Sequence, residues 1–178
     1  MKTKNTLLIT FALASVTALA ACAQAPDTAA PTTSAPMSEM PTMTHQTHDV
    51  AALPLVVVSK SPSCGCCGQW VEHMRAAGFT LEVHNMANMN PVKERVGVPP
   101  GKGSCHTAEV AGYFIEGHVP AEDVQRLLAE RPAARGLAVP GMPMGSPGMP
   151  VAPGHEQPYD VLLVAEDGST SVYARHND

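Results

Sequence analysis

Three cysteines lie within four residues of this 178-residue chain, in the sequence Ser-Pro-Ser-Cys-Gly-Cys-Cys-Gly at positions 61–68. An apolar run at 55–58 precedes them, and a helical pattern of apolar residues follows. This order places Cys64 at the N-terminus of a helix, where free N–H groups and the helix dipole favour the thiolate over the thiol. Such a turn suits either a redox dithiol or a site for soft metal ions.

The third thiol favours the metal site over the redox dithiol. A redox pair needs only Cys64 and Cys67, whereas Cys66 adds a sulfur beside them. Gly65 and Gly68 also remove side-chain bulk where a ligand could approach. We therefore interpret the turn first as a metal site and second as a site of disulfide chemistry.

A fourth thiol, Cys105, lies in the sequence Gly-Ser-Cys-His-Thr at 103–107. Four thiols in an exported domain would ordinarily form two disulfides. Adjacent Cys66 and Cys67 cannot easily pair with each other, but a Cys64–Cys67 bridge together with a Cys66–Cys105 bridge is geometrically possible. The disulfide interpretation therefore stays open.

The spacing also bears on the kind of metal. Structural zinc sites usually take their ligands as two separated cysteine pairs, whereas three of these thiols come from one turn. Adjacent Cys66 and Cys67 cannot readily both reach one ion together with Cys64, which favours sulfurs that bridge several ions. Soft Cu(I) tolerates shared thiolates, and the methionines elsewhere in the chain suit the same ion.

The first 21 residues have the features of a secretion signal. A short basic head at 1–5 precedes an apolar run at 7–20, which is too short for a membrane span of about 20 residues. The sequence Leu-Ala-Ala-Cys at 19–22 resembles the bacterial lipobox and implies that Cys22 carries lipid after residues 1–21 are removed. An ordinary cleaved signal followed by a chance cysteine is the other interpretation. We expect a periplasmic protein that contacts the membrane only through its lipid, at the outer membrane because Ala23 gives no retention signal.

Residues 22–52 are rich in Ala, Pro, Thr, Ser and Met without apolar periodicity, which predicts a disordered tether. The segment contains thioether and imidazole groups that could scavenge copper or could have accumulated by drift, namely Met37, Met40, Met43, His45 and His48.

The charge of the mature chain excludes one class of partner. Loss of Lys2 and Lys4 with the signal lowers Lys+Arg from 11 to 9 against 16 Asp+Glu, so the net charge is 9 − 16 = −7. An acidic chain of this kind is a poor binder of phosphate backbones, and no nucleic-acid partner is expected.

Residues 53–178 should form one α/β domain. Apolar periodicity and Gly/Pro stops predict a strand at 55–59, a helix at 65–77, a strand at 79–84, a short helix at 91–96, a hairpin with arms at 107–111 and 113–117, a helix between Pro120 and Pro132, and a last hairpin with arms at 160–165 and 170–175. The order is that of a thioredoxin-like mixed sheet flanked by helices, with an added C-terminal hairpin. In that topology the loop before the first hairpin brings Cys105 to the other three thiols.

The segment 136–154 is too rich in Pro and Gly for a helix or a central strand, so a long loop is predicted there. It contains Met142, Met144 and Met149. We expect it to lie over the cysteines, with Met142 and Met149 as copper ligands because each follows a glycine that lets the backbone approach. Among the histidines, His106 is the favoured further ligand, ahead of His73 and His118.

Six segments together carry a resemblance to a known family. They are, in order, Ser-Pro-Ser-Cys-Gly-Cys-Cys-Gly-Gln-Trp-Val-Glu-His-Met, Gly-Val-Pro-Pro, Ser-Cys-His-Thr-Ala, Tyr-Phe-Ile-Glu-Gly-His-Val-Pro-Ala-Glu-Asp, Arg-Gly-Leu-Ala-Val-Pro-Gly-Met-Pro and Tyr-Asp-Val-Leu-Leu. Over about residues 55–175 the chain resembles the CopG-type bacterial copper-resistance proteins. The resemblance implies a thioredoxin-like fold in the cell envelope and a polynuclear copper site, with Cys64, Cys66, Cys67 and Cys105 as ligands.

The expected function is therefore copper resistance. The protein would hold several Cu(I) ions in a cysteine-bridged site, with Cu(I)/Cu(II) cycling as a further capability and other envelope copper-handling proteins as partners. We favour a metal-binding protein over an enzyme. The alternatives are a thiol–disulfide oxidoreductase, with Cys64 as nucleophile and Cys67 as resolving thiol, and a domain whose disulfides only hold it together.

Replacing Cys22 tests the lipid anchor. The variant Cys22→Ser lacks the acceptor thiol and should leave the protein soluble or uncleaved, whereas the wild type should fractionate with membranes. Wild-type protein free in the periplasm would contradict the lipidation.

Overall fold

The computed structural model describes residues 52–178 of the chain. The predicted signal, Cys22 and the methionines and histidines of the tether lie outside the described residues. Within the described part, no helix has the length and apolar character needed to cross a membrane.

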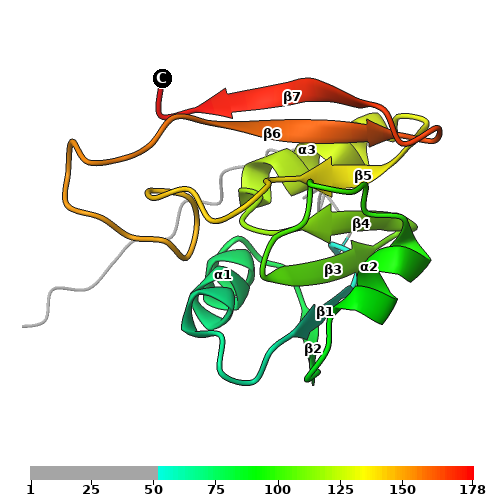
Figure 1. Ribbon diagram of the computed structural model, residues 1–178, viewed down its shortest axis with the longest axis horizontal. Coiled ribbons are helices and arrows are strands. Elements are labelled where there is room, and N and C mark those ends of the chain that lie inside the picture. The colour runs from blue at the N-terminus through cyan, green and yellow to red at the C-terminus, as the bar shows by residue number, and fades with distance from the viewer. Residues whose placement is uncertain (1–51) are drawn as a thin grey trace, which may run out of the picture. The chain divides into compact units, whose positions relative to one another are not determined.

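The described chain forms a seven-stranded mixed sheet with three helices (Figure 1). The elements are β1 (Val56–Lys60), α1 (Gly65–Ala76), β2 (Leu81–Asn85), α2 (Asn90–Val96), β3 (His106–Val110), β4 (Tyr113–Glu116), α3 (Ala121–Glu130), β5 (Ala134–Ala138), β6 (Tyr159–Ala165) and β7 (Thr170–His176). The strand order is β2-β1-β3-β4-β5-β6-β7. The β1–β2 and β4–β5 pairs are parallel and the other pairs are antiparallel. The predicted α/β class and the added C-terminal hairpin are confirmed.

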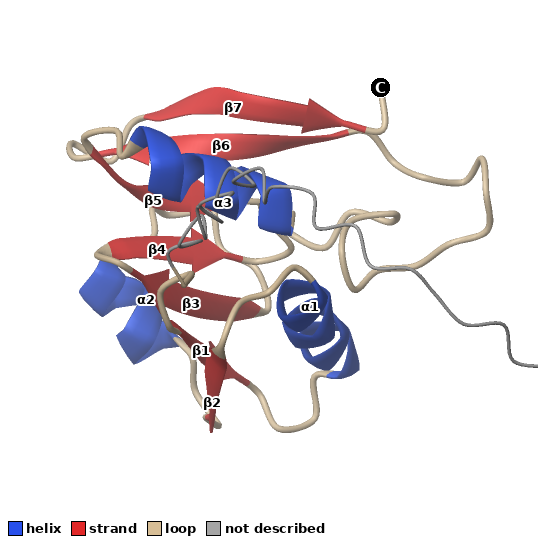
Figure 2. Ribbon diagram, turned by 180° about the vertical axis from the view of Figure 1, so that it is seen from behind, coloured by secondary structure: helices blue, strands red, loops and turns tan. Residues whose placement is uncertain are grey.

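Helices cover both faces of the sheet. Figure 2 shows α3 in front of the sheet and α2 behind it. Strand alternation explains the division, since Ile115 packs into the core with α1 and α3 whereas its neighbour Phe114 packs on the opposite face with Val96 of α2. On the first face, Trp70 and Leu127 are fully buried and hold α1 and α3 against the strands.

Helix α1 begins where the sequence predicts. Cys64 is its N-cap residue in an extended conformation, and the apolar residues Trp70, Val71 and Met74 turn one face to the core. The helix ends before Gly78, whose φ of 93° is a left-handed conformation that favours glycine. The cysteine turn is thus held between a buried strand and a well-anchored helix.

The prediction that 136–154 contains no central strand is wrong at its start. Residues 134–138 form β5, which lies between β4 and β6. Gly136 permits this, because a Cβ atom there would lie 1.9 Å from the Phe114 carbonyl oxygen. The glycine that argued against a strand is therefore the residue that lets β5 approach β4, and burial of Leu137 and Ala138 completes the pairing.

Gly136→Ala tests this close approach. The added methyl group must displace the β4 backbone, which should lower the free energy of unfolding by about 3 kcal/mol or more. Gly68→Ala is the matched control, since a Cβ there meets nothing within 4 Å and should leave stability unchanged or raise it by about 0.5–1 kcal/mol. Denaturant unfolding of both variants measures the difference, and equal midpoints would contradict the packing argument.

Candidate metal centre

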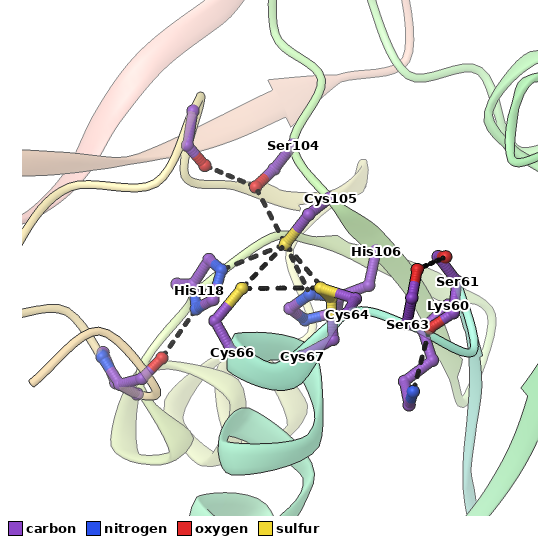
Figure 3. The surroundings of a disulfide bond; sticks show 12 residues. Lys60, Ser61, Ser63, Cys64, Cys66, Cys67, Ser104, Cys105, His106 and His118 are labelled. Atoms are coloured by element: carbon purple, nitrogen blue, oxygen red, sulfur yellow. Dashed lines mark hydrogen bonds between the residues drawn. A yellow bond between two sulfur atoms is a disulfide. The ribbon is translucent and has the colours of Figure 1, made fainter.

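Four cysteine sulfurs meet at the N-terminal end of α1 (Figure 3). Cys64, Cys66 and Cys67 come from the turn and first residues of α1, and Cys105 comes from the segment that leads into β3. The four Sγ atoms all lie within 4.8 Å of one another.

The pairing of β1 with β3 explains the meeting. The strands are antiparallel, and Lys60 at the end of β1 is opposite His106 at the start of β3. The end of β1, which leads into the cysteine turn, therefore lies beside the start of β3, which follows Cys105. Residues about 40 positions apart in the sequence are neighbours for this reason.

The four thiols are not equivalent. Cys64 and Cys67 form a disulfide, and Cys66 and Cys105 are the free cysteines among the described residues. The Sγ atom of Cys105 lies 3.3 Å from that of Cys67 and 4.0 Å from that of Cys66, and the Cys64 and Cys66 sulfurs are 3.4 Å apart. Of the two bridges that the sequence leaves open, the structure contains the first and brings the second pair into proximity.

Burial raises the pKa of the Cys105 thiol to about 11, and the nearby Cys66 sulfur adds to the effect. The thiolate is the form that binds metals, so binding here requires a cation strong enough to displace the proton. Soft cations with high affinity for sulfur meet that requirement.

Two imidazoles complete the site around Cys105. Its Sγ atom lies 3.1 Å from Nε2 of His118 and 3.4 Å from Nδ1 of His106, and the three ligand atoms form a second group that could hold a metal ion. His118 Nδ1 lies 2.7 Å from the Pro147 carbonyl oxygen, to which it can only donate. This bond leaves the Nε2 lone pair facing Cys105, as in metal-binding histidines whose other nitrogen is held by a carbonyl.

The three candidate histidines have different surroundings. His106 is fully buried with its ring 4.4 Å from that of Trp70, and its Nε2 atom has no hydrogen-bond partner among the described residues. Burial lowers its pKa to about 3 and also lowers the pKa of His118. His73 instead accepts a hydrogen bond from the backbone N–H of Ala121, 3.0 Å away, at the start of α3. The structure thus gives His73 a structural role. It places His118 beside the cysteines, although the sequence favoured His106 as the histidine ligand.

The long loop contacts both cysteine segments through its backbone. A Cβ atom at Gly148 would lie 2.6 Å from the Cys66 carbonyl oxygen, so the loop packs directly on the first turn of α1. Nearer the start of the loop, the Ser104 hydroxyl donates a hydrogen bond to the Gly141 carbonyl oxygen. Met149, which follows Gly148, is half-buried, whereas Met142 is 51% exposed. The two methionines stay predicted ligands.

A buried acidic residue that the sequence analysis did not identify holds the Cys105 segment. Glu116 is fully buried and accepts hydrogen bonds from the Ser104 N–H at 2.6 Å and the Thr107 hydroxyl at 2.7 Å. It also pairs with Lys93 of α2. The sequence does contain one signal for this role, a glutamate at the end of an otherwise apolar strand, because a charge buried there must have partners.

The buried histidines predict an acid-sensitive fold. Burial lowers the pKa of His73, His106 and His118 below 6.5, so these groups bind protons less readily in the folded protein than in the unfolded chain. The unfolding free energy of the metal-free protein should therefore fall as the pH drops below 6.5, with His106 alone contributing about 1.4 kcal/mol per pH unit.

Denaturant unfolding between pH 7 and pH 5 measures this slope, in a range above most carboxylate titration. His106→Gln should reduce the dependence of the unfolding free energy on pH. His155→Gln, at an exposed position between the long loop and β6, should leave that dependence unchanged. A wild-type stability that is constant over this range would contradict the prediction.

Comparison with known proteins gives one family match and two similar solved structures. A family described as "Protein of unknown function, DUF411" matches residues 102–149. The solved structure named "Copper resistance protein copG- Form 1" is 43% identical with a TM-score of 0.67, and the match covers 71% of this chain and 99% of that one. For "Copper resistance protein copG- Form 2" the values are 44% identity, a TM-score of 0.66, and coverage of 70% and 98%. No curated protein matches the chain.

Proposed function

The chain belongs to the CopG family of copper resistance proteins, and from this premise we propose that it binds several Cu(I) ions in a cysteine-bridged site. The observation that carries the proposal is the convergence of four cysteine Sγ atoms within 4.8 Å, from two segments that the sheet brings together. Copper is the cargo of this site, and resistance follows from its sequestration or conversion.

The arrangement favours several shared ions over one. Cys66 and Cys67 are adjacent in α1, and the short sulfur-to-sulfur distances place each thiolate near more than one other. Cu(I) accepts low coordination numbers and soft, bridging sulfur ligands. With the Cys64–Cys67 disulfide reduced, the site offers four thiolates, and with the disulfide intact it offers the two of Cys66 and Cys105.

The histidines support redox cycling of copper as part of the function. Cys105, His106 and His118 form a group of one sulfur and two imidazoles that shares Cys105 with the four-thiol group. Imidazole nitrogens suit Cu(II) and thiolates suit Cu(I), and two histidines with one cysteine are the ligand set of electron-transfer copper sites. A site with both donor types can hold copper in either oxidation state without a large rearrangement.

We place this activity in the periplasm, with the protein anchored by lipid on Cys22 and exchanging copper with other envelope copper-handling proteins. The support for this location is the signal-like head and the Leu-Ala-Ala-Cys sequence at 19–22.

Counting copper tests the proposal. The reduced wild-type protein, loaded with Cu(I) without oxygen and desalted, should retain more than one copper per chain by elemental analysis. Cys105→Ser should lower that number without preventing folding, because Cys105 reaches the site from a separate segment. Cys22→Ser, outside the site, is the matched control and should bind as the wild type does.

Retention of no more than one copper by the wild type would reject the polynuclear site. Loss of about 2–5 kcal/mol in metal-free Cys105→Ser with unchanged copper uptake would instead assign Cys105 to a structural bridge.

A thiol–disulfide oxidoreductase is the second candidate, and the Cys64–Cys67 disulfide at the N-terminus of α1 is the observation that favours it. In that case Cys64→Ser should abolish reduction of an added disulfide substrate such as insulin, while Cys105→Ser should retain it. Insulin reduction that is no faster than the uncatalysed reaction would exclude this function.

The methionines of the long loop provide a separate prediction. Met142→Leu together with Met149→Leu keeps volume and apolarity, so stability should change by less than about 1.5 kcal/mol. Loss of two thioethers should lower Cu(I) affinity in a competition with a chromogenic chelator, or speed air oxidation of the site. Met144→Leu on the same loop is the control, and a double variant that behaves as the wild type would make the loop a cover without ligands.

A further inference from the structure

The Cys64–Cys67 disulfide lies in contact with a free thiol from another part of the chain. Cys105 Sγ is 3.3 Å from the Cys67 sulfur, and Figure 3 shows Cys105 reaching toward the turn from the segment before β3. We propose that Cys105 exchanges with this disulfide, so that the bridge moves to Cys67–Cys105 and Cys64 becomes a free thiol.

The reaction is a balanced internal exchange. Cys105, as its thiolate, attacks the Cys67 sulfur, a Cys67–Cys105 bond forms, the Cys64–Cys67 bond breaks, and Cys64 departs with the electron pair. Cys105 gives up its proton to solvent as it attacks, and the Cys64 thiolate takes up a proton from solvent. The number of disulfides is unchanged, so the step requires no oxidant or reductant.

The surroundings of Cys64 favour its departure, and neighbouring groups hold Cys105 in place for the attack. Cys64 is the N-cap residue of α1, where backbone N–H groups and the helix dipole stabilise a departing thiolate. His118 is oriented by its bond to Pro147, so its Nε2 atom faces Cys105 and can accept a hydrogen bond from the thiol. Glu116 holds the neighbouring Ser104 N–H and thereby fixes the segment that carries the nucleophile.

Exchange would change which two thiols are free. Before it, the free pair is Cys66 with Cys105, whose sulfurs are 4.0 Å apart beside His118. Afterwards the free pair is Cys64 with Cys66 at the start of α1, whose sulfurs are 3.4 Å apart in the present structure. The exchange belongs to the metal-free protein and does not rest on copper binding. If copper does bind, the same step would offer it two alternative dithiols.

A three-thiol variant makes the exchange measurable. The full chain with Cys22→Ser and Cys66→Ser retains Cys64, Cys67 and Cys105 as its thiols. The metal-free protein is oxidised with one equivalent of oxidised glutathione, incubated with iodoacetamide for increasing times, acid-quenched and digested with trypsin. Cys64 and Cys67 fall in peptide 61–75 and Cys105 in peptide 103–126, so the original bridge lies within one peptide and the new bridge joins two.

The expected result is growth of the joined pair 61–75/103–126 with Cys64 alkylated, at the expense of the bridge within 61–75. Adding Cys105→Ser removes the nucleophile and should abolish alkylation of Cys64. Alkylation confined to Cys105, with the Cys64–Cys67 bridge intact at every time, overturns the proposal.

A second variant guards against misfolding of the first. Cys64→Ser in the Cys22→Ser, Cys66→Ser chain leaves Cys67 and Cys105, which should close the new bridge with the same oxidant. Failure to close it also overturns the proposal, because the two sulfurs would then not meet. Exchange without copper binding would reject the proposed function alone, and copper binding without exchange would reject this inference alone.

Discussion

The antiparallel pairing of β1 with β3 is the interaction on which the site depends. Without the register that sets Lys60 opposite His106, the cysteine turn and Cys105 would lie at different places on the molecule. The helices secure this register from both faces, with Trp70 of α1 buried on one side and Lys93 of α2 paired with Glu116 on the other. The position of one sulfur thus depends on a backbone ladder and a buried ion pair.

The site combines buried imidazoles with thiols that are mostly half-buried, since Cys67 alone of the four cysteines is fully buried. Burial raises the pKa of Cys105 and lowers those of His106 and His118, so each group is held in its neutral form. Neutral donors that are buried or half-buried avoid the cost of isolated charge until a cation arrives, and binding then exchanges protons for metal. The backbone of the long loop, packed at Gly148 on the first turn of α1, limits access of water to the same atoms.

Disulfide formation and metal binding would compete for the same four sulfurs. A thiol engaged in the Cys64–Cys67 disulfide is not available as a thiolate ligand, so oxidation of the turn removes half of the sulfur donors. The histidines beside Cys105 are unaffected by that oxidation and leave a mixed nitrogen and sulfur group in place. The oxidation state of the turn would therefore select between a sulfur-rich site and a mixed one.

Local sequence patterns are enough to predict the order of the first strands and helices, the C-terminal hairpin and the cysteine turn at the start of α1, because periodicity and Gly/Pro stops are local properties. The sequence by itself could not show β5, since the close approach at Gly136 exists only against the Phe114 backbone. Nor could it rank His118 above His73 or identify Glu116, because a polar side chain becomes a ligand or an anchor only through the partners that packing gives it. Which thiols are bridged and which histidines face Cys105 emerges only from the folded chain, since the sequence allows more than one cysteine pairing and packing sets the directions of the side chains.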